Sequence, residues 1–266
     1  MYKRQGTHTG GLNKYDIKTG RITLYMHHSG DETSLPSNII RDIEPYTSDS
    51  LIIATQNGIC IMEKESGKCR HILRNLPNGK SLGMVADVTL DKNNNLWIAA
   101  TGEGVYVYNM SSSNVKNYRN DTTREGSISS NNINNIITDS KNNIWICTSG
   151  CGLDLYIPET DSFRNFDKQN NNLANDCIYQ ACESPVTGNL LLITTDGFSI
   201  FDKEKKIFYN YNSQNGFPID AVNENALYIA SDGEIFLGGI RNMVSFYEKD
   251  LFLKHKPYSI CLLYTS

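Results

Sequence analysis

Two stretches of the sequence are near copies of each other, NLWIAATGEGVYVYN (95–109) and NIWICTSGCGLDLYI (143–157). Each begins with Asn, an aliphatic residue, Trp and Ile, passes through a polar turn that ends in Gly, and continues into an alternating run with Tyr near its end. Trp97 and Trp145 lie 48 residues apart. This spacing indicates a repeat of one supersecondary unit.

Weaker copies continue the repeat in both directions, at 50–62, 189–201 and 234–246. The turn glycines are spaced 47, 46, 48 and 45 residues apart, at Gly11, Gly58, Gly104, Gly152 and Gly197. A sixth copy has Asn242 there, another residue that tolerates positive φ. We expect the Trp position to be filled in order by Ile52, Trp97, Trp145, Leu192 and Phe236.

Apolar residues within each unit alternate with a period near 2, as in Val105 and Val107 or Leu153 and Leu155, which predicts strands. Further apolar runs precede and follow each copy, so each unit reads as four short strands, and we predict no helix. Four-stranded units at this spacing predict an all-β fold, a β-propeller of four-stranded blades. The expected blade units are 6–28, 38–73, 84–118, 132–166, 176–211 and 224–255.

The strand pattern predicts an incomplete ring of about five and a half blades, taken from a seven-bladed propeller. The first unit is expected to supply only the last two strands of a blade. Residues 1–5 and 261–266 fit no pattern of the repeat and are interpreted as non-native scars, so the propeller is assigned to 6–260. An open β-sandwich is the alternative fold.

The composition is that of a globular protein, with 39 % hydrophobic and 10 % aromatic residues in 266. The net charge is −4, from 25 basic and 29 acidic residues, which argues against a nucleic-acid partner. No stretch approaches the roughly 20 apolar residues that cross a bilayer. The sequence therefore predicts membrane contact only through segments of a parent protein outside this chain.

The repeat D-x-x-x-N-[LI]-W-I-x-T-x-G-x-G-[LV]-x-x-Y resembles the two-component regulator propeller repeats, and the resemblance covers essentially all of 6–260. It implies a periplasmic sensor region of a hybrid two-component histidine kinase, of the kind that responds to glycans. Residues 215–250 look like the last blade before the β-sandwich of that family. The resemblance also implies an oligosaccharide ligand and a homodimer formed through the parent sensor.

No kinase box is found in the sequence, and we predict a non-catalytic sensor that needs no cofactor. DKNNNLW (91–97) and DSKNNIW (139–145) lack the Ser and Gly of sialidase Asp boxes, so their Asp and Asn residues are expected to close turns. Two other functions stay open: a propeller-fold polysaccharide lyase or hydrolase, and a protein-interaction propeller.

Histidines and cysteines give no metal or catalytic constellation. His27 and His28 are adjacent, so in a strand they would face opposite ways. Of seven cysteines, Cys261 lies in the C-terminal scar, and Cys147 and Cys151 bracket a tight turn and are the first pair to test for a disulfide. Buried free thiols are the expected state.

A ligand site is expected on the propeller face shared by the loops between second and third strands and the loops between blades. These loops carry charged, Ser and Asn side chains, which suit a hydroxyl-rich ligand because it needs several directional hydrogen bonds. The candidate ligand-binding residues are Glu103, Arg119, Arg124, Ser149, Asp196 and Arg241.

Overall fold

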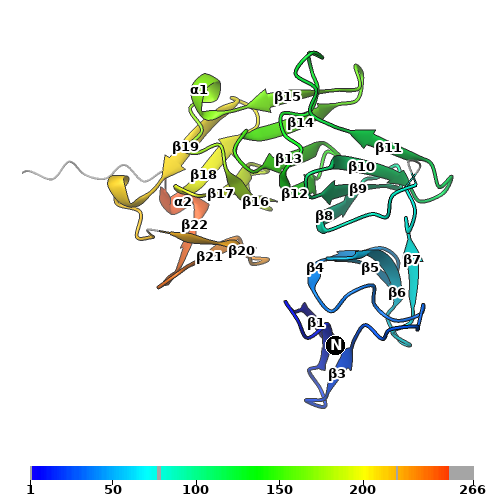
Figure 1. Cartoon of the computed structure of the whole chain (residues 1–266). Coiled ribbons are helices and arrows are strands. Elements are labelled where there is room, and N and C mark those ends of the chain that lie inside the picture. The colour runs from blue at the N-terminus through cyan, green and yellow to red at the C-terminus, as the bar shows by residue number, and fades with distance from the viewer. Residues whose placement is uncertain (1, 77–78, 220, 252–266) are drawn as a thin grey trace, which may run out of the picture.

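The computed structural model describes residues 2–76, 79–219 and 221–251, which form six antiparallel sheets (Figure 1). The first sheet contains β1 (Tyr2–Gly6), β2 (Leu12–Asp16) and β3 (Ile22–Tyr25). The second contains β4 (Ile40–Pro45), β5 (Ser50–Thr55), β6 (Gly58–Glu63) and β7 (Cys69–Ile72). The third contains β8 (Val85–Leu90), β9 (Asn95–Ala100), β10 (Gly104–Asn109) and β11 (Val115–Tyr118).

The fourth sheet contains β12 (Ile133–Thr138), β13 (Ile144–Thr148), β14 (Leu153–Ile157) and β15 (Ser162–Phe166). The fifth contains β16 (Ile178–Glu183), β17 (Leu190–Thr194), β18 (Gly197–Asp202) and β19 (Ile207–Tyr211). The sixth contains β20 (Val222–Ile229), β21 (Glu234–Gly239) and β22 (Met243–Tyr247). Within every sheet the strands neighbour one another in chain order, so each unit is an up-and-down meander as predicted.

The ends of the chain differ from the prediction. Residues 2–5, which were predicted to be a non-native scar, belong with Gly6 to β1, which pairs with Leu12–Asp16, so the first sheet has three strands instead of two. The sixth sheet also has three strands, and the end of the predicted unit 224–255 and the segment 261–266 lie outside the described residues.

The prediction that helices are absent is also wrong, because the described residues contain three one-turn helices, two between strands and one after β22. They are α1 (Lys168–Asn171), the 3-10 helix η1 (Ser213–Asn215) and α2 (Glu248–Leu251). Asp167 and Asn212 cap the first two by accepting backbone N–H groups of the turn that follows. No helix in the described part of the chain is long and apolar enough to cross a membrane.

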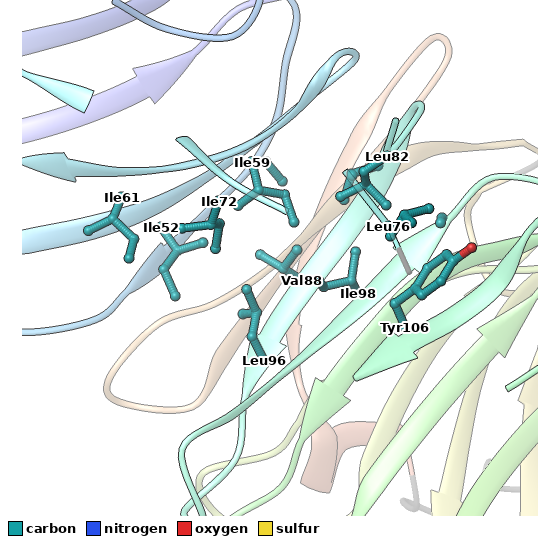
Figure 2. Close-up of a cluster of buried hydrophobic side chains, with 13 residues drawn as sticks. Ile52, Ile59, Ile61, Ile72, Leu76, Leu82, Val88, Leu96, Ile98 and Tyr106 are labelled. Carbon is teal, nitrogen blue, oxygen red and sulfur yellow. The ribbon is translucent and has the colours of Figure 1, made fainter. Parts of the chain in front are cut away.

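The sheets follow one another around a common axis, with the first strand of each sheet innermost (Figure 1). β1, β4, β8, β12, β16 and β20 contact one another in that order. The core lies between neighbouring sheets. Figure 2 shows one such layer, where Ile52 and Ile61 of the second sheet face Leu96 and Ile98 of the third. One small sheet cannot bury both apolar faces, whereas a series of sheets can.

The two tryptophans occupy equivalent places, as the repeat predicts. Trp97 packs with Ile133 and Phe163 of the next sheet, and Trp145 packs with Ile178 and Phe201 of the sheet after it; each is 3 % exposed. The prediction that Leu192 fills this position is wrong. Leu191 pairs with Cys182 and Ile200 and faces the sixth sheet, while Leu192 faces back towards Trp145. A shift of one residue moves a side chain to the other face of a strand.

Candidate functional site

Four innermost strands share a β-bulge near their first residue. Pairing with the second strand skips one residue in each, and the skipped residues are Arg41, Ala86, Asn134 and Tyr179. In β20 the skip is longer, from Val222 to Leu227, and it includes Glu224 and Asn225. A bulge re-aims the side chain of its extra residue and is common beside functional sites. Here the bulges of five sheets bring these side chains to one place.

That place is a cavity of about 340 Å³, which we call the axial pocket. It lies at the end of the sheets where the innermost strands begin. Its size is at the lower end of the roughly 300–1,000 Å³ range of small-molecule pockets. The lining residues are Arg41, Met84, Ala86, Thr101, Asn132, Ile133, Asn134, Ser149, Tyr179, Glu224 and Asn225.

The residue that follows each of the four single-residue bulges joins its sheet to the next one. Asp42 accepts the backbone N–H of Val88 at 3.4 Å, and Asp87 accepts that of Ile136 at 2.8 Å. Asn135 accepts the N–H of Ala181 at 2.8 Å, and Gln180 that of Leu227 at 3.1 Å. An innermost strand has a pairing partner on one side only, so without these acceptors the N–H groups on its other side would lack protein partners. We call this series the axial ladder.

Two carboxyl groups of the axial ladder lie against each other. Burial raises the pKa of Asp87 well above its ordinary value, and the neighbouring Asp42 carboxylate raises it further. Burial also raises the pKa of Asp42. Because two adjacent carboxylates repel when both are charged, the pair holds a proton to a higher pH than a free aspartate would. The proton lets one carboxyl donate a hydrogen bond to the other.

The axial pocket combines a cation, a carboxylate, amides and a phenol. Within the described residues Arg41 has no carboxylate partner, and its guanidinium contacts the Met84 sulfur at 3.4 Å. Asn134 donates its amide to the Ile178 carbonyl at 2.8 Å, which leaves its side-chain oxygen as an acceptor. Burial raises the pKa of Tyr179, and the nearby Cys177 and Glu224 add to this, so its phenol is neutral. These groups can hold a polar ligand at several points.

The residues predicted from the sequence do not form one site. Ser149 lines the axial pocket, but the other five are not among its lining residues. Arg119 forms an ion pair with Glu103 on the rim of the third sheet, and Arg124 donates to the Asp161 carbonyl at 3.4 Å. Asp196 lies in the turn after β17, and Arg241 in the turn after β21. Their assignment as ligand-binding residues stays a prediction.

Sequence reasoning missed the main residues of the axial pocket. Arg41, Tyr179 and Glu224 lie in or beside predicted strands, whereas the ligand site was predicted on the loops. The side chains at the bulges share no chemical property, so a repeat search does not align them. The signal that could have found them is the polar residue immediately after each bulge, at Asp42, Asp87, Asn135 and Gln180, spaced 45, 48 and 45 residues apart.

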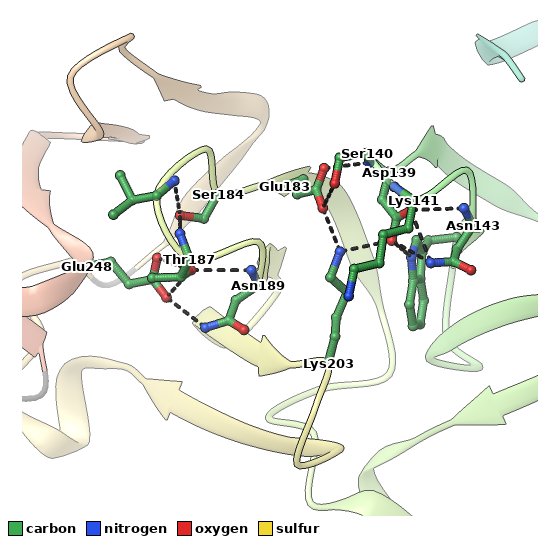
Figure 3. A network of polar contacts seen from close by, with 12 residues as sticks. Asp139, Ser140, Lys141, Asn143, Glu183, Ser184, Thr187, Asn189, Lys203 and Glu248 are labelled. Carbon is green, nitrogen blue, oxygen red and sulfur yellow. Dashed lines mark hydrogen bonds and ion pairs between the residues drawn. The ribbon is translucent and has the colours of Figure 1, made fainter. Parts of the chain in front are cut away.

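The other end of the sheets carries a polar network with a structural role (Figure 3). Asp139, in the turn after β12, accepts hydrogen bonds from the Trp145 indole at 3.0 Å and from Lys203 at 2.9 Å. Lys203 also bonds Glu183 at 2.6 Å. Burial alone would raise the pKa of Asp139, but hydrogen bonds from Lys203, Asn143 and Trp145 outweigh it and lower the pKa to about 2. The predicted turn-closing role of Asp and Asn is confirmed here.

The cysteines of the described residues are free thiols, at Cys60, Cys69, Cys147, Cys151, Cys177 and Cys182. Cys147 is buried and pairs with Leu153 across the hairpin, not with Cys151. Burial raises the pKa of the Cys147 thiol well above its ordinary value, so it is a weak nucleophile. Within the described ranges, no group of three or more His, Cys, Asp and Glu side chains could hold a metal ion.

Comparison with known proteins supports the repeat and the fold. Residues 127–150 match the family model described as two component regulator propeller, and they include Asp139, Asn143 and Trp145. No curated protein sequence matches the chain significantly.

Among solved structures, the chain is similar to the extracellular domain of the hybrid two component system BT3049 from B. thetaiotaomicron. The TM-score is 0.72 and the identity 21 %, over 90 % of this chain and 30 % of that one. The chain is also similar to the computationally designed Ika8 protein, with a TM-score of 0.60 and 12 % identity, over 92 % of this chain and 67 % of that one.

The chain spans 30 % of the length of the BT3049 extracellular domain. At identities of 21 % and 12 %, the two similar structures show the fold alone. The family match confirms the predicted resemblance to two-component regulator propeller repeats. The described residues form a β-propeller of six blades with three or four antiparallel strands each, and residues 127–150 match the two component regulator propeller repeat.

Proposed function

We propose that the chain is the extracytoplasmic ligand-sensing region of a hybrid two-component sensor histidine kinase, that it lies in the periplasm, and that its ligand is a glycan. The observation that carries this proposal is the match of residues 127–150 to the two component regulator propeller model. The similarity to an extracellular domain of a hybrid two component system agrees with it. The kinase would belong to another part of the parent protein, and this chain would act without catalysis.

Signalling in this proposal depends on differential binding. A ligand shifts a two-state equilibrium only as far as its affinities for the two states differ. We propose that the parent sensor is a homodimer and that a bound ligand favours one arrangement of its propellers. The kinase would respond to that arrangement across the membrane.

We also propose that the ring is completed to seven blades by further chain of the parent. The support is the apolar surface on the outward faces of the first and sixth sheets. Ile22 and Leu24 of β3 are 63 % and 51 % exposed, and Tyr228 of β20 and Met243 of β22 are 65 % and 69 % exposed. In the interior sheets the equivalent faces pack against a neighbour. Sequencing the gene on both sides should reveal further repeats, a membrane helix and kinase boxes; their absence would overturn this parent.

The sensing role is tested by isothermal titration of the chain with a panel of neutral and acidic oligosaccharides. The proposal predicts binding of at least one class without release of reducing ends in a parallel turnover assay. If no oligosaccharide of the panel binds, the result would contradict glycan sensing. Turnover that is lost in Glu103→Gln or Asp196→Asn would instead favour the lyase or hydrolase.

A further inference from the structure

We propose that the axial pocket binds a saccharide of one or two rings that carries a carboxylate, with the Arg41 guanidinium paired to that carboxylate. This inference rests on the proposed sensing function and names its site and ligand class.

The same β-bulge occurs in successive sheets around the pocket, but the side chain at the bulge differs from sheet to sheet. The residue after each of the four single-residue bulges, in the axial ladder, is polar and joins neighbouring sheets. The bulge residue itself is a cation, a methyl group, an amide or a phenol in successive sheets, at Arg41, Ala86, Asn134 and Tyr179. A position with one structural role would carry similar residues in each repeat. The bulge positions do not, and they meet in a single pocket, so they determine what that pocket contacts.

The charge of the pocket selects an anionic group at one end. Arg41 comes from β4 and Glu224 from β20, the first and last of the five innermost strands that line the pocket in series. Within the described residues neither side chain is in an ion pair. A guanidinium offers two parallel N–H donors that fit a carboxylate. A ligand would therefore place its carboxylate at Arg41 and its uncharged end towards Glu224.

The remaining groups fit sugar hydroxyls. Asn132, Asn225, Ser149 and Thr101 can each donate and accept hydrogen bonds, and Glu224 can accept them. The Tyr179 ring offers an apolar face for the C–H side of a sugar, and its hydroxyl has no hydrogen-bond partner within the described residues. The size of the pocket, about 340 Å³, suits a small ligand and excludes a long chain from lying fully inside it.

The test uses two ligands that differ at one carbon, D-glucuronate and D-glucose, with isothermal titration of the 266-residue chain. The unsubstituted chain should bind glucuronate more tightly than glucose. Arg41→Gln should weaken glucuronate binding about tenfold or more and leave glucose binding unchanged, because a charge-assisted pair is lost. Arg21→Gln is the matched control, since it removes the same charge from an exposed position that does not line the pocket. It should leave both affinities unchanged.

A second pair of variants tests the ring of Tyr179. Tyr179→Ala should weaken both sugars, whereas Tyr179→Phe should keep their affinities because the ring face remains. Thermal unfolding of each variant confirms that it folds. Equal binding of glucuronate and glucose, or an Arg41→Gln chain with unchanged glucuronate affinity, would overturn the pocket assignment while other glycans could still support sensing. Failure of the chain to bind any sugar of the larger panel would overturn the proposed function as well.

Discussion

Two aspartates of the repeat have the same local contacts and differ in one long-range contact. Asp91 and Asp139 each accept the Trp indole N–H six residues later, at 3.1 and 3.0 Å, and the side-chain amide of the Asn four residues later. Asp139 also forms an ion pair with Lys203 of the next sheet. In the fourth sheet, which packs next to the sheet of Asp91, the position equivalent to Lys203 is Pro158, and its side chain has no hydrogen-bond donor. The same motif is therefore neutralised by a cation in one blade only.

Replacing these aspartates should have unequal effects on stability. Asp139→Asn should lower the free energy of unfolding by about 3 kcal/mol, because it leaves the Lys203 ammonium only partly compensated in a nearly buried place. Asp91→Asn, the matched control, should cost about 1 kcal/mol because it weakens hydrogen bonds without stranding a charge. Urea unfolding measures both, and equal losses would show that Lys203 contributes nothing to the network.

Glu44 should make stability depend on pH. Burial raises the pKa of Glu44 to about 7 from 4.5, with a further contribution from the Asp42 charge. The folded state therefore holds this proton more tightly than the unfolded state does. The stabilisation is complete below about pH 4.5 and is lost as the pH rises through 7.

Glu44→Gln should remove part of this dependence, on the order of 2 kcal/mol between those limits. The measurement is the free energy of unfolding by urea at several pH values. Glu65→Gln, in an exposed turn, is the control and should leave the slope unchanged. A Glu44→Gln chain with the slope of the unsubstituted protein would contradict the buried position of this carboxyl.

At the level of elements, the hairpin of the last two strands depends, in the first, third, fourth and fifth sheets, on a glycine whose added Cβ would collide with a carbonyl oxygen. A Cβ on Gly152 would lie 2.2 Å from the Phe166 carbonyl oxygen, and φ there is +81°. Gly104 and Gly197 stand in the same relation to Tyr118 and Tyr211, always 14 residues later. Gly58 has a φ of +104° but no such contact, since its nearest neighbour is the Leu82 oxygen at 3.9 Å. Gly11 of the first sheet has the same relation to the Tyr25 oxygen, at 2.2 Å, so the last two strands approach less closely in the second sheet than in the first, third, fourth and fifth.

Replacing these glycines by alanine should distinguish the free-energy cost of backbone strain from that of a steric clash with a carbonyl oxygen. Gly152→Ala should cost about 2–4 kcal/mol of unfolding free energy, from the left-handed backbone and from the collision with the Phe166 carbonyl. Gly58→Ala should cost about 1 kcal/mol, from the backbone alone. Thermal and urea unfolding measure the difference, and a Gly58→Ala variant as damaged as Gly152→Ala would refute the close approach.

The elements also show how far sequence reasoning reaches. The glycine spacing and the two tryptophans predicted the meanders and their stacking because both depend on local chemistry repeated in every blade. The Trp position was assigned to Leu192 instead of Leu191 because LLLI (190–193) is apolar throughout, so no alternation shows which side chains lie on which face of the strand. Strand β1 was missed because YKRQG (2–6) lacks an apolar pattern. The axial pocket was missed because a bulge depends on pairing, which the side chain at the bulge does not reveal.

At the level of the whole molecule, the sheets are arranged radially, and their innermost strands face one axis. In that arrangement the inward N–H groups are bonded by side chains of the neighbouring sheet, through the axial ladder. In any other packing of the same six meanders these N–H groups would lie at free sheet edges. The ladder therefore distinguishes a propeller from a row of separate hairpins.

Amide hydrogen exchange, measured residue by residue, tests this arrangement most directly. The account predicts slow exchange at the four donors of the ladder, Val88, Ile136, Ala181 and Leu227, and predicts that Asp87→Ala accelerates exchange at Ile136 while Ala181 stays protected. Rapid exchange at all four, beside protected amides in the second strands, would contradict the radial arrangement and the axial pocket built on it.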